Sequence, residues 1–336
     1  MKKKSAFITG IGGQDGSYLC ELLLEKGYEV HGLVRRVAVE DHEARFSRIN
    51  RIFGKINIHH GDVSDYPTIW RLIAAIKPDE TYHLAAQSFV DESFKDPIST
   101  LRVNIDGTHH LLSAIKELHP KCRFYFAATS EMFGRASESP QNERTPFNPV
   151  SPYGISKLSS FYLTRMHREA HGLFAVSGIL FNHESGRRGF EFVTRKISRT
   201  AAEIKLGLAK ELRLGNLDAR RDWGFAGDYV KAMWLMLQQK TPRDYAIGTG
   251  ETHSVKEFAE EAFGYLGLEW KKYVKTDESL FRPAEVHELC ADARRAQRDL
   301  GWKPTVSFKE LVRLMTDADM ESLRGGLRRH GRGVIE

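Results

Sequence analysis

The sequence predicts an α/β protein in which a doubly wound parallel sheet is followed by a smaller C-terminal α/β domain. Along the first half of its 336 residues, short β-branched runs alternate with longer amphipathic stretches. This alternation is typical of βαβ units around a parallel sheet. A glycine-rich turn follows the first short run, and after about Phe181 the pattern loosens into segments rich in glycine and arginine.

Six strands and four long helices are expected in the first half, in alternating order. One alternating series of this kind makes a doubly wound sheet the most economical arrangement. The predicted strands are Ser5–Thr9, Glu29–Val34, Ile56–His60, Glu80–Leu84, Arg123–Ala128 and Ala175–Leu180. The predicted helices are Tyr18–Glu25, Tyr66–Ile76, Ile98–Leu118 and Tyr153–His171.

The chain is expected to divide near residue 180. Residues 1–180 would form a dinucleotide-binding Rossmann domain and residues 181–336 a substrate-binding domain, with part of 216–250 returning to the first. Glycine- and arginine-rich stretches interrupt the later helices, as expected for a smaller domain that closes over a ligand. These stretches are Ser185–Phe190, Gly215–Gly227 and Gly248–Glu251.

The charge composition does not favour nucleic acid as a partner. The formal net charge is +6, and Lys and Arg are dispersed except for a cluster in the tail, from Arg324 to Arg332. No base-stacking or groove-reading motif accompanies this charge. A small polyanionic ligand accounts for a modest positive balance equally well.

A metal site or a disulfide framework is not expected. His167 and His171 have the i, i+4 spacing of a helical zinc site, but Arg168 stands where a zincin needs glutamate. The three cysteines are far apart and form no CxxC pair; they are Cys20, Cys122 and Cys290.

The chain is expected to be cytoplasmic and not to enter a membrane. No apolar run reaches the roughly 18 residues that suggest a membrane span. The basic start, Met1 to Lys4, is followed only by Ser5–Thr9 before glycines begin. That stretch is too short for the core of a signal peptide.

The turn after the first predicted strand is a candidate dinucleotide site. Gly10, Gly13 and Gly16 have GxxGxxG spacing, whereas the alternative GxGxxG spacing fails at Asp15. Glycines at such a turn let the backbone approach a pyrophosphate, which binds at the helix N-terminus where unpaired N–H groups favour anions. Simple chain reversal is the alternative function of such a turn.

The end of the second strand indicates which dinucleotide is bound. An NAD site places an acidic residue about 20 residues past the glycines, to hold the ribose 2′-hydroxyl. Arg35 and Arg36 stand there, and no acid appears until Glu40. Two guanidinium groups suit a 2′-phosphate. We therefore predict NADP, with a pair of solvated loop arginines as the alternative.

Residues after the third and fourth strands complete the predicted cofactor site. Asp62 and Val63 are placed to contact the adenine. The segment Leu84 to Ser88, which includes Ala86, would line the pyrophosphate and nicotinamide side.

A Tyr-x-x-x-Lys motif provides candidate catalytic groups. Tyr153 and Lys157 lie one turn apart on one face of a predicted helix, behind Ser151 and Pro152. A nearby ammonium lowers the pKa of a phenol, so that tyrosinate can take a hydroxyl proton while hydride leaves the same carbon. The motif alone is a weak signal; its place after the fifth strand strengthens it.

The fifth strand ends in Thr129-Ser130-Glu131. Ligands in such sheets bind outside the carboxyl ends of the strands, so Thr129 and Glu131 are expected to face the substrate beside Tyr153. A plain dehydrogenase does not need this carboxylate, whereas removal of a carbon-bound proton does. The alternative is that Glu131 is an ordinary loop or helix-start carboxylate.

Together these residues resemble the extended short-chain dehydrogenase/reductase superfamily and, within it, the GDP-mannose 4,6-dehydratases. The resemblance runs from Phe7-Ile8-Thr9-Gly10 to Gly301-Trp302-Lys303-Pro304. Ser130 is typical of these enzymes, where a dTDP-glucose dehydratase would carry aspartate. The most specific stretches are Gln14–Leu19, Thr129–Glu131, Gly178–Ser185, Phe192–Ile197, Leu214–Gly224 and Arg282–Val286.

The motifs and the resemblance together give expected roles for individual residues. The expected catalytic residues are Thr129, Glu131, Tyr153 and Lys157. The expected NADP contacts are Gly10, Gly13, Gln14, Asp15, Gly16, Arg35, Arg36, Asp62, Val63, Leu84, Ala86, Ser88, Tyr153, Lys157, His183 and Arg188. The expected GDP-sugar contacts are Ser88, Glu131, Asn182, Val193, Lys196, Gly215, Arg220, Arg282 and Glu285.

The sequence departs from the family pattern at a few positions. Gly12 stands where Thr is usual, and Gly186 where Pro is usual. Val37-Ala38 replaces the usual Ser-Ser, and the acidic segment Glu40–Glu43 follows, in a loop that can reach a neighbouring subunit's cofactor in this family. By analogy we expect a homodimer through the helices beginning near Ile98 and Tyr153, with a tetramer as the alternative.

The implied reaction is a redox-neutral dehydration of GDP-mannose with a tightly held NADP. Other possibilities stay open: a dehydratase for another GDP-sugar such as a manno-heptose, a 4-keto-6-deoxy-sugar reductase, or a non-catalytic NADP-sensing protein. A reductase would consume NADPH stoichiometrically. Absence of Tyr153, Lys157 or Glu131 would favour a sensor, and all three are present.

Overall fold

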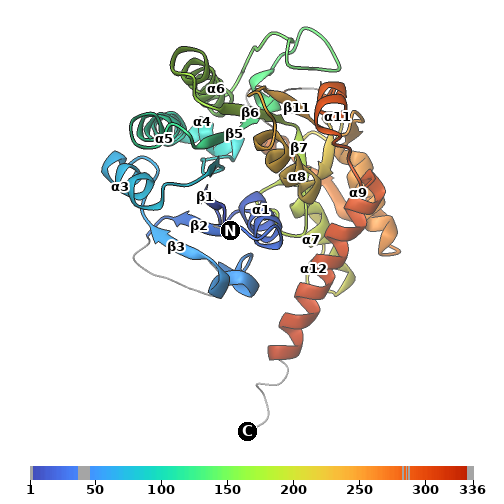
Figure 1. Ribbon diagram of the computed structural model, residues 1–336. Coiled ribbons are helices and arrows are strands. Elements are labelled where there is room, and N and C mark those ends of the chain that lie inside the picture. Colours follow the sequence, from blue (N-terminus) through green and yellow to red (C-terminus); the bar gives the residue numbers. More distant parts are fainter. Residues whose placement is uncertain (1–2, 37–45, 282–283, 285, 287, 331–336) are drawn as a thin grey trace.

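The computed structural model describes residues 3–36, 46–281, 284, 286 and 288–330, the last five of these as backbone only. A seven-stranded parallel sheet forms the larger part of the molecule (Figure 1). Its strand order is β11-β6-β5-β4-β1-β2-β3, which is a doubly wound order. The predicted fold class is confirmed. The strands are β1 (Ser5–Thr9), β2 (Glu29–Val34), β3 (Asn57–His60), β4 (Glu80–His83), β5 (Arg123–Thr129), β6 (Ala175–Leu180) and β11 (Tyr245–Ile247).

Helices cover both faces of this sheet (Figure 1). On one face, α1 (Gln14–Glu25) and α8 (Ala226–Leu237) pack in one apolar core. On the other, α3 (Tyr66–Ile76), α5 (Pro97–Leu118) and α6 (Pro152–His171) pack in a second core. The central strands are buried on both faces, which explains why β1, β5 and β6 are mostly apolar; all six residues of β6 are buried.

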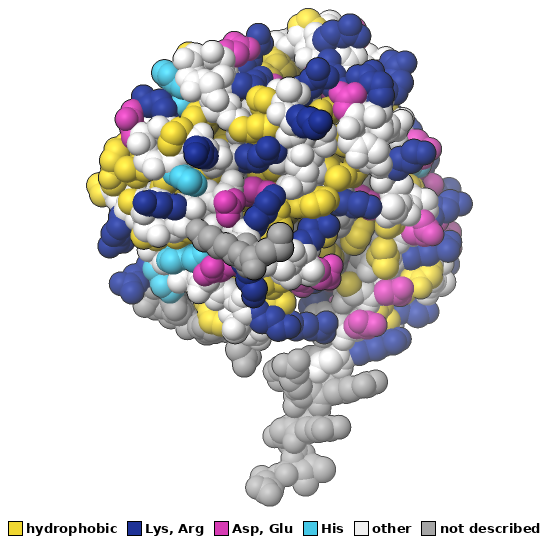
Figure 2. All heavy atoms as spheres, in the orientation of Figure 1, with side chains coloured by type: hydrophobic (Ala, Val, Ile, Leu, Met, Phe, Trp, Pro, Cys, Tyr) yellow, Lys and Arg dark blue, Asp and Glu magenta, His cyan; other side chains and the backbone are white. Residues whose placement is uncertain are grey.

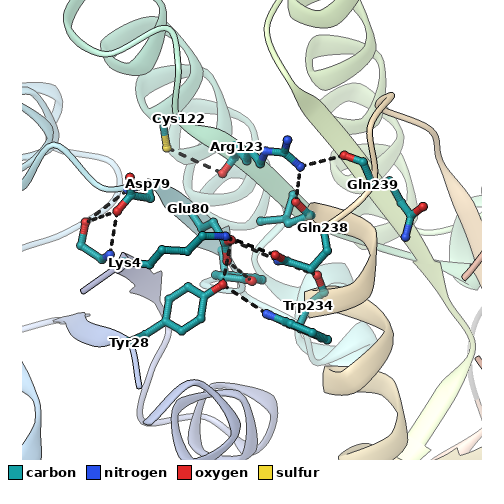
Figure 3. A network of polar contacts seen from close by, with 12 residues as sticks. Lys4, Tyr28, Asp79, Glu80, Cys122, Arg123, Trp234, Gln238 and Gln239 are labelled. Atoms are coloured by element: carbon teal, nitrogen blue, oxygen red, sulfur yellow. Dashed lines mark hydrogen bonds and ion pairs between the residues drawn. The ribbon is translucent and has the colours of Figure 1, made fainter. Parts of the chain in front are cut away.

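A polar network fastens α8 to the sheet, at the amino ends of the strands (Figure 3). The Glu80 carboxylate on β4 is 1% exposed and accepts hydrogen bonds from the hydroxyls of Tyr28 at 2.9 Å and Tyr82 at 2.7 Å. Gln238, the residue after α8, donates to the same carboxylate at 3.0 Å. Buried polar groups are stable only when paired in this way. The candidate site lies at the opposite, carboxyl ends of the strands, away from this network.

The later part of the chain also contains small sheets of its own. Here β7 (Asn182–Glu184) pairs with β10 (Trp223–Phe225), and β8 (Leu212–Leu214) pairs with β13 (Val274–Thr276). The two-residue strand β9 (Arg220–Arg221) lies between β12 (His253–Ser254) and β14 (Glu288–Leu289). A third apolar core joins β8, β10 and β13 to helices α7 (Val193–Lys205), α9 (Val255–Tyr265) and α12 (Phe308–His330).

Short helices complete the structure that is described. They are η1 (Asn50–Lys55), α4 (Val90–Lys95), η2 (Ser130–Met132), α10 (Trp270–Tyr273), η3 (Glu278–Leu280) and α11 (Arg294–Leu300). On the face shown in Figure 2, described Lys and Arg side chains are interspersed with Asp and Glu and do not gather in one patch.

Candidate active site

A cavity of about 1160 Å³ lies between the carboxyl ends of the parallel strands and the later part of the chain. It is large enough for a dinucleotide together with a second ligand, because single ligand pockets usually measure about 300–1,000 Å³. Most of the predicted site residues line it together. They are Gly10, Gly13, Gln14, Asp15, Gly16, Arg35, Asp62, Val63, Leu84, Ala86, Ser88, Thr129, Glu131, Tyr153, Lys157, Asn182, His183, Arg188, Val193, Lys196 and Gly215.

The glycine-rich turn forms one wall of the cavity, between β1 and α1. Gly10 has a φ of +76°, in the left-handed region that favours glycine. A Cβ atom at Gly10 would lie 2.8 Å from the backbone nitrogen of Ala85, so no side chain fits there. Gly13 is the N-cap of α1, and no side chain caps this helix end. Backbone N–H groups at the start of α1 can therefore bind an anion.

A charged pair joins this turn to the later part of the chain. His183 on β7 lies with Nε2 2.7 Å from Oδ2 of Asp15 and Nδ1 2.8 Å from the Phe181 carbonyl oxygen. Burial by itself lowers the pKa of His183, but the Asp15 carboxylate outweighs this effect and the net pKa is raised. Burial likewise raises the pKa of Asp15, and the His183 charge and hydrogen bond reverse the shift, so that its pKa is lowered.

The two predicted 2′-phosphate arginines lie differently. Both are exposed, but Arg35, just after β2, lines the cavity, whereas Arg36 does not. Asp62 lies in the next turn, where its Oδ1 accepts hydrogen bonds from the backbone N–H and the hydroxyl of Ser64. Val63 beside it is 5% exposed.

The start of α6 places Tyr153 and Lys157 in the cavity. The Ser151 hydroxyl caps this helix by accepting from the N–H of Gly154 at 3.0 Å, and Pro152 occupies its first turn. Nζ of Lys157 donates to the carbonyl of Ala127 on β5 at 2.9 Å. Burial lowers the pKa of Lys157 to about 8, and it raises that of Tyr153 to about 12 against a hydrogen bond with Thr129.

The end of β5 places Thr129 and Glu131 beside the same cavity. The Thr129 hydroxyl accepts from the backbone N–H of Glu131 at 3.3 Å and caps η2. The Glu131 side chain lines the cavity although the residue is only 8% exposed. A phenol, an ammonium, a hydroxyl and a carboxylate thus face one space, which is a set suited to moving two different protons.

One predicted GDP-sugar contact, Arg220, does not line the cavity, and two others are not among the described residues. Arg220 instead donates to the Thr252 carbonyl at 2.6 Å, and Arg282 and Glu285 lie outside the described residues. The neighbouring Arg221 lines the cavity in place of Arg220. Successive side chains of a strand point to opposite faces, which explains why only one of the two arginines of β9 is directed inward.

Several aromatic residues of the cavity wall were not predicted. Phe89 and Phe192 approach each other edge to face, with ring centroids 5.7 Å apart. Phe281 lines the wall and is 47% exposed. Phe89 follows the predicted Ser88 directly, so one further residue would have included it. Phe192 opens the quoted stretch Phe192–Ile197, in which only Val193 and Lys196 were assigned a contact.

The parallel sheet, the glycine-rich turn and the Tyr153–Lys157 pair define an extended short-chain dehydrogenase/reductase. The fold agrees with solved structures of this kind. One is a dTDP-glucose 4,6-dehydratase from Streptomyces venezuelae with NAD bound, with a TM-score of 0.82, 24% identity and coverage of 96% of this chain and 98% of that one. Another is RMD from Pseudomonas aeruginosa complexed with NADPH, with a TM-score of 0.79, 24% identity and coverage of 95% and 100%. At this identity the likeness concerns the fold alone.

Sequence relatives narrow the assignment. The family model described as GDP-mannose 4,6 dehydratase matches residues 7–315. GDP-mannose 4,6 dehydratase 1 of Arabidopsis thaliana is 51% identical over 331 residues, covering 95% of this chain and 90% of that protein. The human GDP-mannose 4,6 dehydratase is 48% identical over 346 residues, covering 95% and 92%. The chain belongs to the GDP-mannose 4,6-dehydratase family, and the resemblance in the sequence is confirmed.

The described residues contain neither a membrane-spanning helix nor a metal-binding cluster. None of their helices combines the length and apolarity that a membrane crossing requires. No group of three or more His, Cys, Asp or Glu side chains among them is arranged to hold a metal ion.

Proposed function

We propose that this chain is a hydro-lyase that converts GDP-mannose to GDP-4-keto-6-deoxymannose with a tightly held NADP. Membership of the family supports the reaction. The observation that carries the proposal is the position of Glu131, whose carboxylate lines the same cavity as Tyr153 and Lys157. Besides a bound nicotinamide, oxidation of a hydroxyl needs only the tyrosine and lysine, whereas loss of water needs a further base.

The cavity fits a nicotinamide dinucleotide. The exposed N-terminus of α1 and the side-chain-free Gly10 leave space and N–H donors for a pyrophosphate. Arg35 at the end of β2 supports NADP over NAD, because a guanidinium pairs well with a 2′-phosphate. When bound, the cofactor supplies the acceptor and donor of hydride.

The first step assigned to the protein is proton removal at the C4 hydroxyl of the sugar, which yields the 4-ketone when the bound cofactor takes up the C4 hydride. We assign this to Tyr153, assisted by the Thr129 hydroxyl that hydrogen-bonds it. Burial holds the pKa of Tyr153 at about 12, so the phenol needs cationic neighbours to ionise. Lys157 provides one such charge, held in place by the Ala127 carbonyl.

The second step is elimination of water across C5 and C6. The 4-ketone acidifies the C5 proton, and we assign its removal to Glu131. The hydroxyl at C6 leaves with a proton as water. Return of hydride to C6 and of a proton to C5 then completes a cycle with no net oxidation, in which Tyr153 is a proton donor within reach of the same space.

The sequence-based domain division is retained as a proposal. Residues 1–180 would bind the cofactor together with α8 and β11, which pack on the same sheet. The remaining residues after 180 would bind the GDP-sugar, with Lys196 among the cations available to its diphosphate.

We also propose that a second copy of the chain is a partner. Ile155, Tyr162 and Met166 are 40–51% exposed and lie on one face of α6, at spacings of seven and four residues. Ile98 at the start of the neighbouring α5 is 72% exposed. Exposed apolar residues that gather on one face mark association surfaces, and this face supports a homodimer.

The test of the function is a substrate panel. The purified protein is incubated with catalytic NADP and GDP-mannose, GDP-manno-heptose, dTDP-glucose or UDP-glucose, and the products are read by mass spectrometry. We expect GDP-mannose to give a product lighter by one water with no net change in NADPH. Turnover of only dTDP- or UDP-sugars, or stoichiometric use of NADPH, would refute the assignment.

A further inference from the structure

A buried ion pair fastens the C-terminal helix α12 to α7. The Arg195 guanidinium on α7 donates to the Asp319 carboxylate on α12 at 2.9 Å from Nε and lies 2.8 Å away at Nη2. The two side chains are 6% and 0% exposed. The Ser198 hydroxyl donates to the second oxygen of Asp319 at 2.7 Å. Figure 1 shows α12 running along the side of the molecule beside α7.

The same guanidinium holds the segment 185–192, which connects β7 to α7. Nη1 of Arg195 donates to the Gly186 carbonyl and also to the Arg188 carbonyl, at 3.4 Å. Arg188 and Phe192 of this segment line the cavity, but Arg195 and Asp319 do not. One side chain thus links α12 to the cavity wall without reaching the cavity itself.

The segment also rests directly on α12. A Cβ atom at Gly186 would lie 2.5 Å from Cβ of Ala318, the residue before Asp319. Real Cβ atoms do not approach so closely, so any side chain at Gly186 would push the segment away from the helix.

Two residues of the segment, Arg188 and Phe192, make a series of contacts inside the cavity. The Arg188 guanidinium lies 3.1 Å from the Glu184 carboxylate and 3.5 Å from the centre of the Phe192 ring. Phe192 in turn contacts Phe89 across the wall. A shift of the backbone at Gly186 would therefore move both a cation and an aromatic ring that face the ligands.

We propose that α12 holds segment 185–192 in position at the cavity wall. Arg195 and Asp319 are therefore positioning residues for the site. Removing one member of a buried ion pair leaves the other charge without a partner. Asp319→Asn would leave Arg195 in this state, and the guanidinium and the carbonyls that it holds would relocate. The C-terminal helix thereby affects the position of site residues, although Arg195 and Asp319 do not line the cavity.

The first test needs no ligand. Amide hydrogen exchange of peptides covering 185–192 is compared in the ligand-free wild type, Asp319→Asn and Arg313→Ala. Arg313 is the matched control because it ties α12 to Glu261 on α9 at 3.0 Å and makes no contact with the segment. We expect exchange in the segment to rise about tenfold or more in Asp319→Asn only, as for loss of one charge-assisted hydrogen bond. Unchanged exchange, or an equal rise in the control, would overturn the proposal.

The second test uses turnover of GDP-mannose and so rests on the proposed function. Gly186→Ala should raise KM about tenfold with a smaller fall in kcat, and adding Ala318→Gly should restore KM, because it removes the atom that the new Cβ meets. A KM like that of the wild type in Gly186→Ala, or no rescue by the second change, would contradict the seating of the segment. If the wild type does not turn over GDP-mannose, the proposed function fails, while the exchange experiment still decides this inference.

Discussion

His183 and Asp15 form a partly buried ion pair in which the imidazole donates from both ring nitrogens. The Phe181 carbonyl accepts from Nδ1 at 2.8 Å, and the Asp15 carboxylate accepts from Nε2 at 2.7 Å. Both partners accept only, so the ring carries both protons. The pair ties the glycine-rich turn to β7 and so joins the cofactor wall to the wall assigned to the sugar nucleotide.

This pair predicts a specific dependence of stability on pH. The pKa of His183 is raised above its ordinary 6.5, so its contribution is complete below pH 6.5 and is lost as the pH rises through the folded-state value. The pKa of Asp15 is lowered below 3.8, so its contribution is complete above pH 3.8 and is lost as the pH falls through its own folded-state value. His183→Gln should therefore reduce the free energy of unfolding most between these limits, by about 1.5–3 kcal/mol.

Urea unfolding at a series of pH values measures this effect. The destabilisation by His183→Gln should shrink as the pH rises above 6.5, and Asp15→Asn should show the same trend. The two changes together should cost less than their sum, because they remove one interaction. A destabilisation that is the same at every pH would show that the ring packs as a neutral group.

The position of Arg35 in the cavity predicts that the protein binds NADP more tightly than NAD. Arg35→Ala should weaken NADP binding by about 1.5–3 kcal/mol, which is about tenfold or more, and leave NAD binding nearly unchanged. Arg36→Ala is the matched control, since Arg36 does not line the cavity. Calorimetric titration of the wild type and both variants gives the affinities. Equal affinity of the wild type for the two dinucleotides would refute the preference.

The role assigned to Lys157 predicts how activity depends on pH. Removal of its ammonium in Lys157→Met removes a charge that favours ionisation of Tyr153, so activity at neutral pH should fall about 10²–10⁴-fold. Part of this activity should return as the pH rises toward the pKa of the phenol, which is about 12 in the ligand-free protein. The measurement is kcat against pH, within the range in which the variant stays folded. Tyr153→Phe should show no such recovery, and a profile for Lys157→Met parallel to that of the wild type would contradict the role.

Much of the fold was predictable because several buried strands, such as β1 and β6, are mostly apolar runs. Strands β1, β2 and β6 begin and end at the predicted residues. The seventh strand, β11, was not predicted, since its three residues Tyr245–Ile247 are too few to show a period. Its place beside β6 is set by tertiary packing.

The site was predictable where local motifs carry it and less so where distant residues meet. Tyr153 and Lys157 are one turn apart, so their common face follows from the spacing. The inward direction of Arg221 depends on how a two-residue strand pairs with its neighbours. Arg195 and Asp319 are 124 residues apart, and nothing in the local pattern of either indicates the other.

The central claim is that Glu131 makes this site a dehydratase, and Glu131→Gln tests it most directly. The change keeps the shape of the side chain but removes its ability to accept a proton, and loss of a positioned base typically costs about 10²–10⁴-fold. On rapid mixing of the NADP-loaded variant with GDP-mannose, we predict absorbance from enzyme-bound NADPH that appears and persists, with little dehydrated product. Tyr153→Phe, which blocks the earlier step, should give neither signal. Formation of the dehydrated product by Glu131→Gln at the wild-type rate would contradict the account.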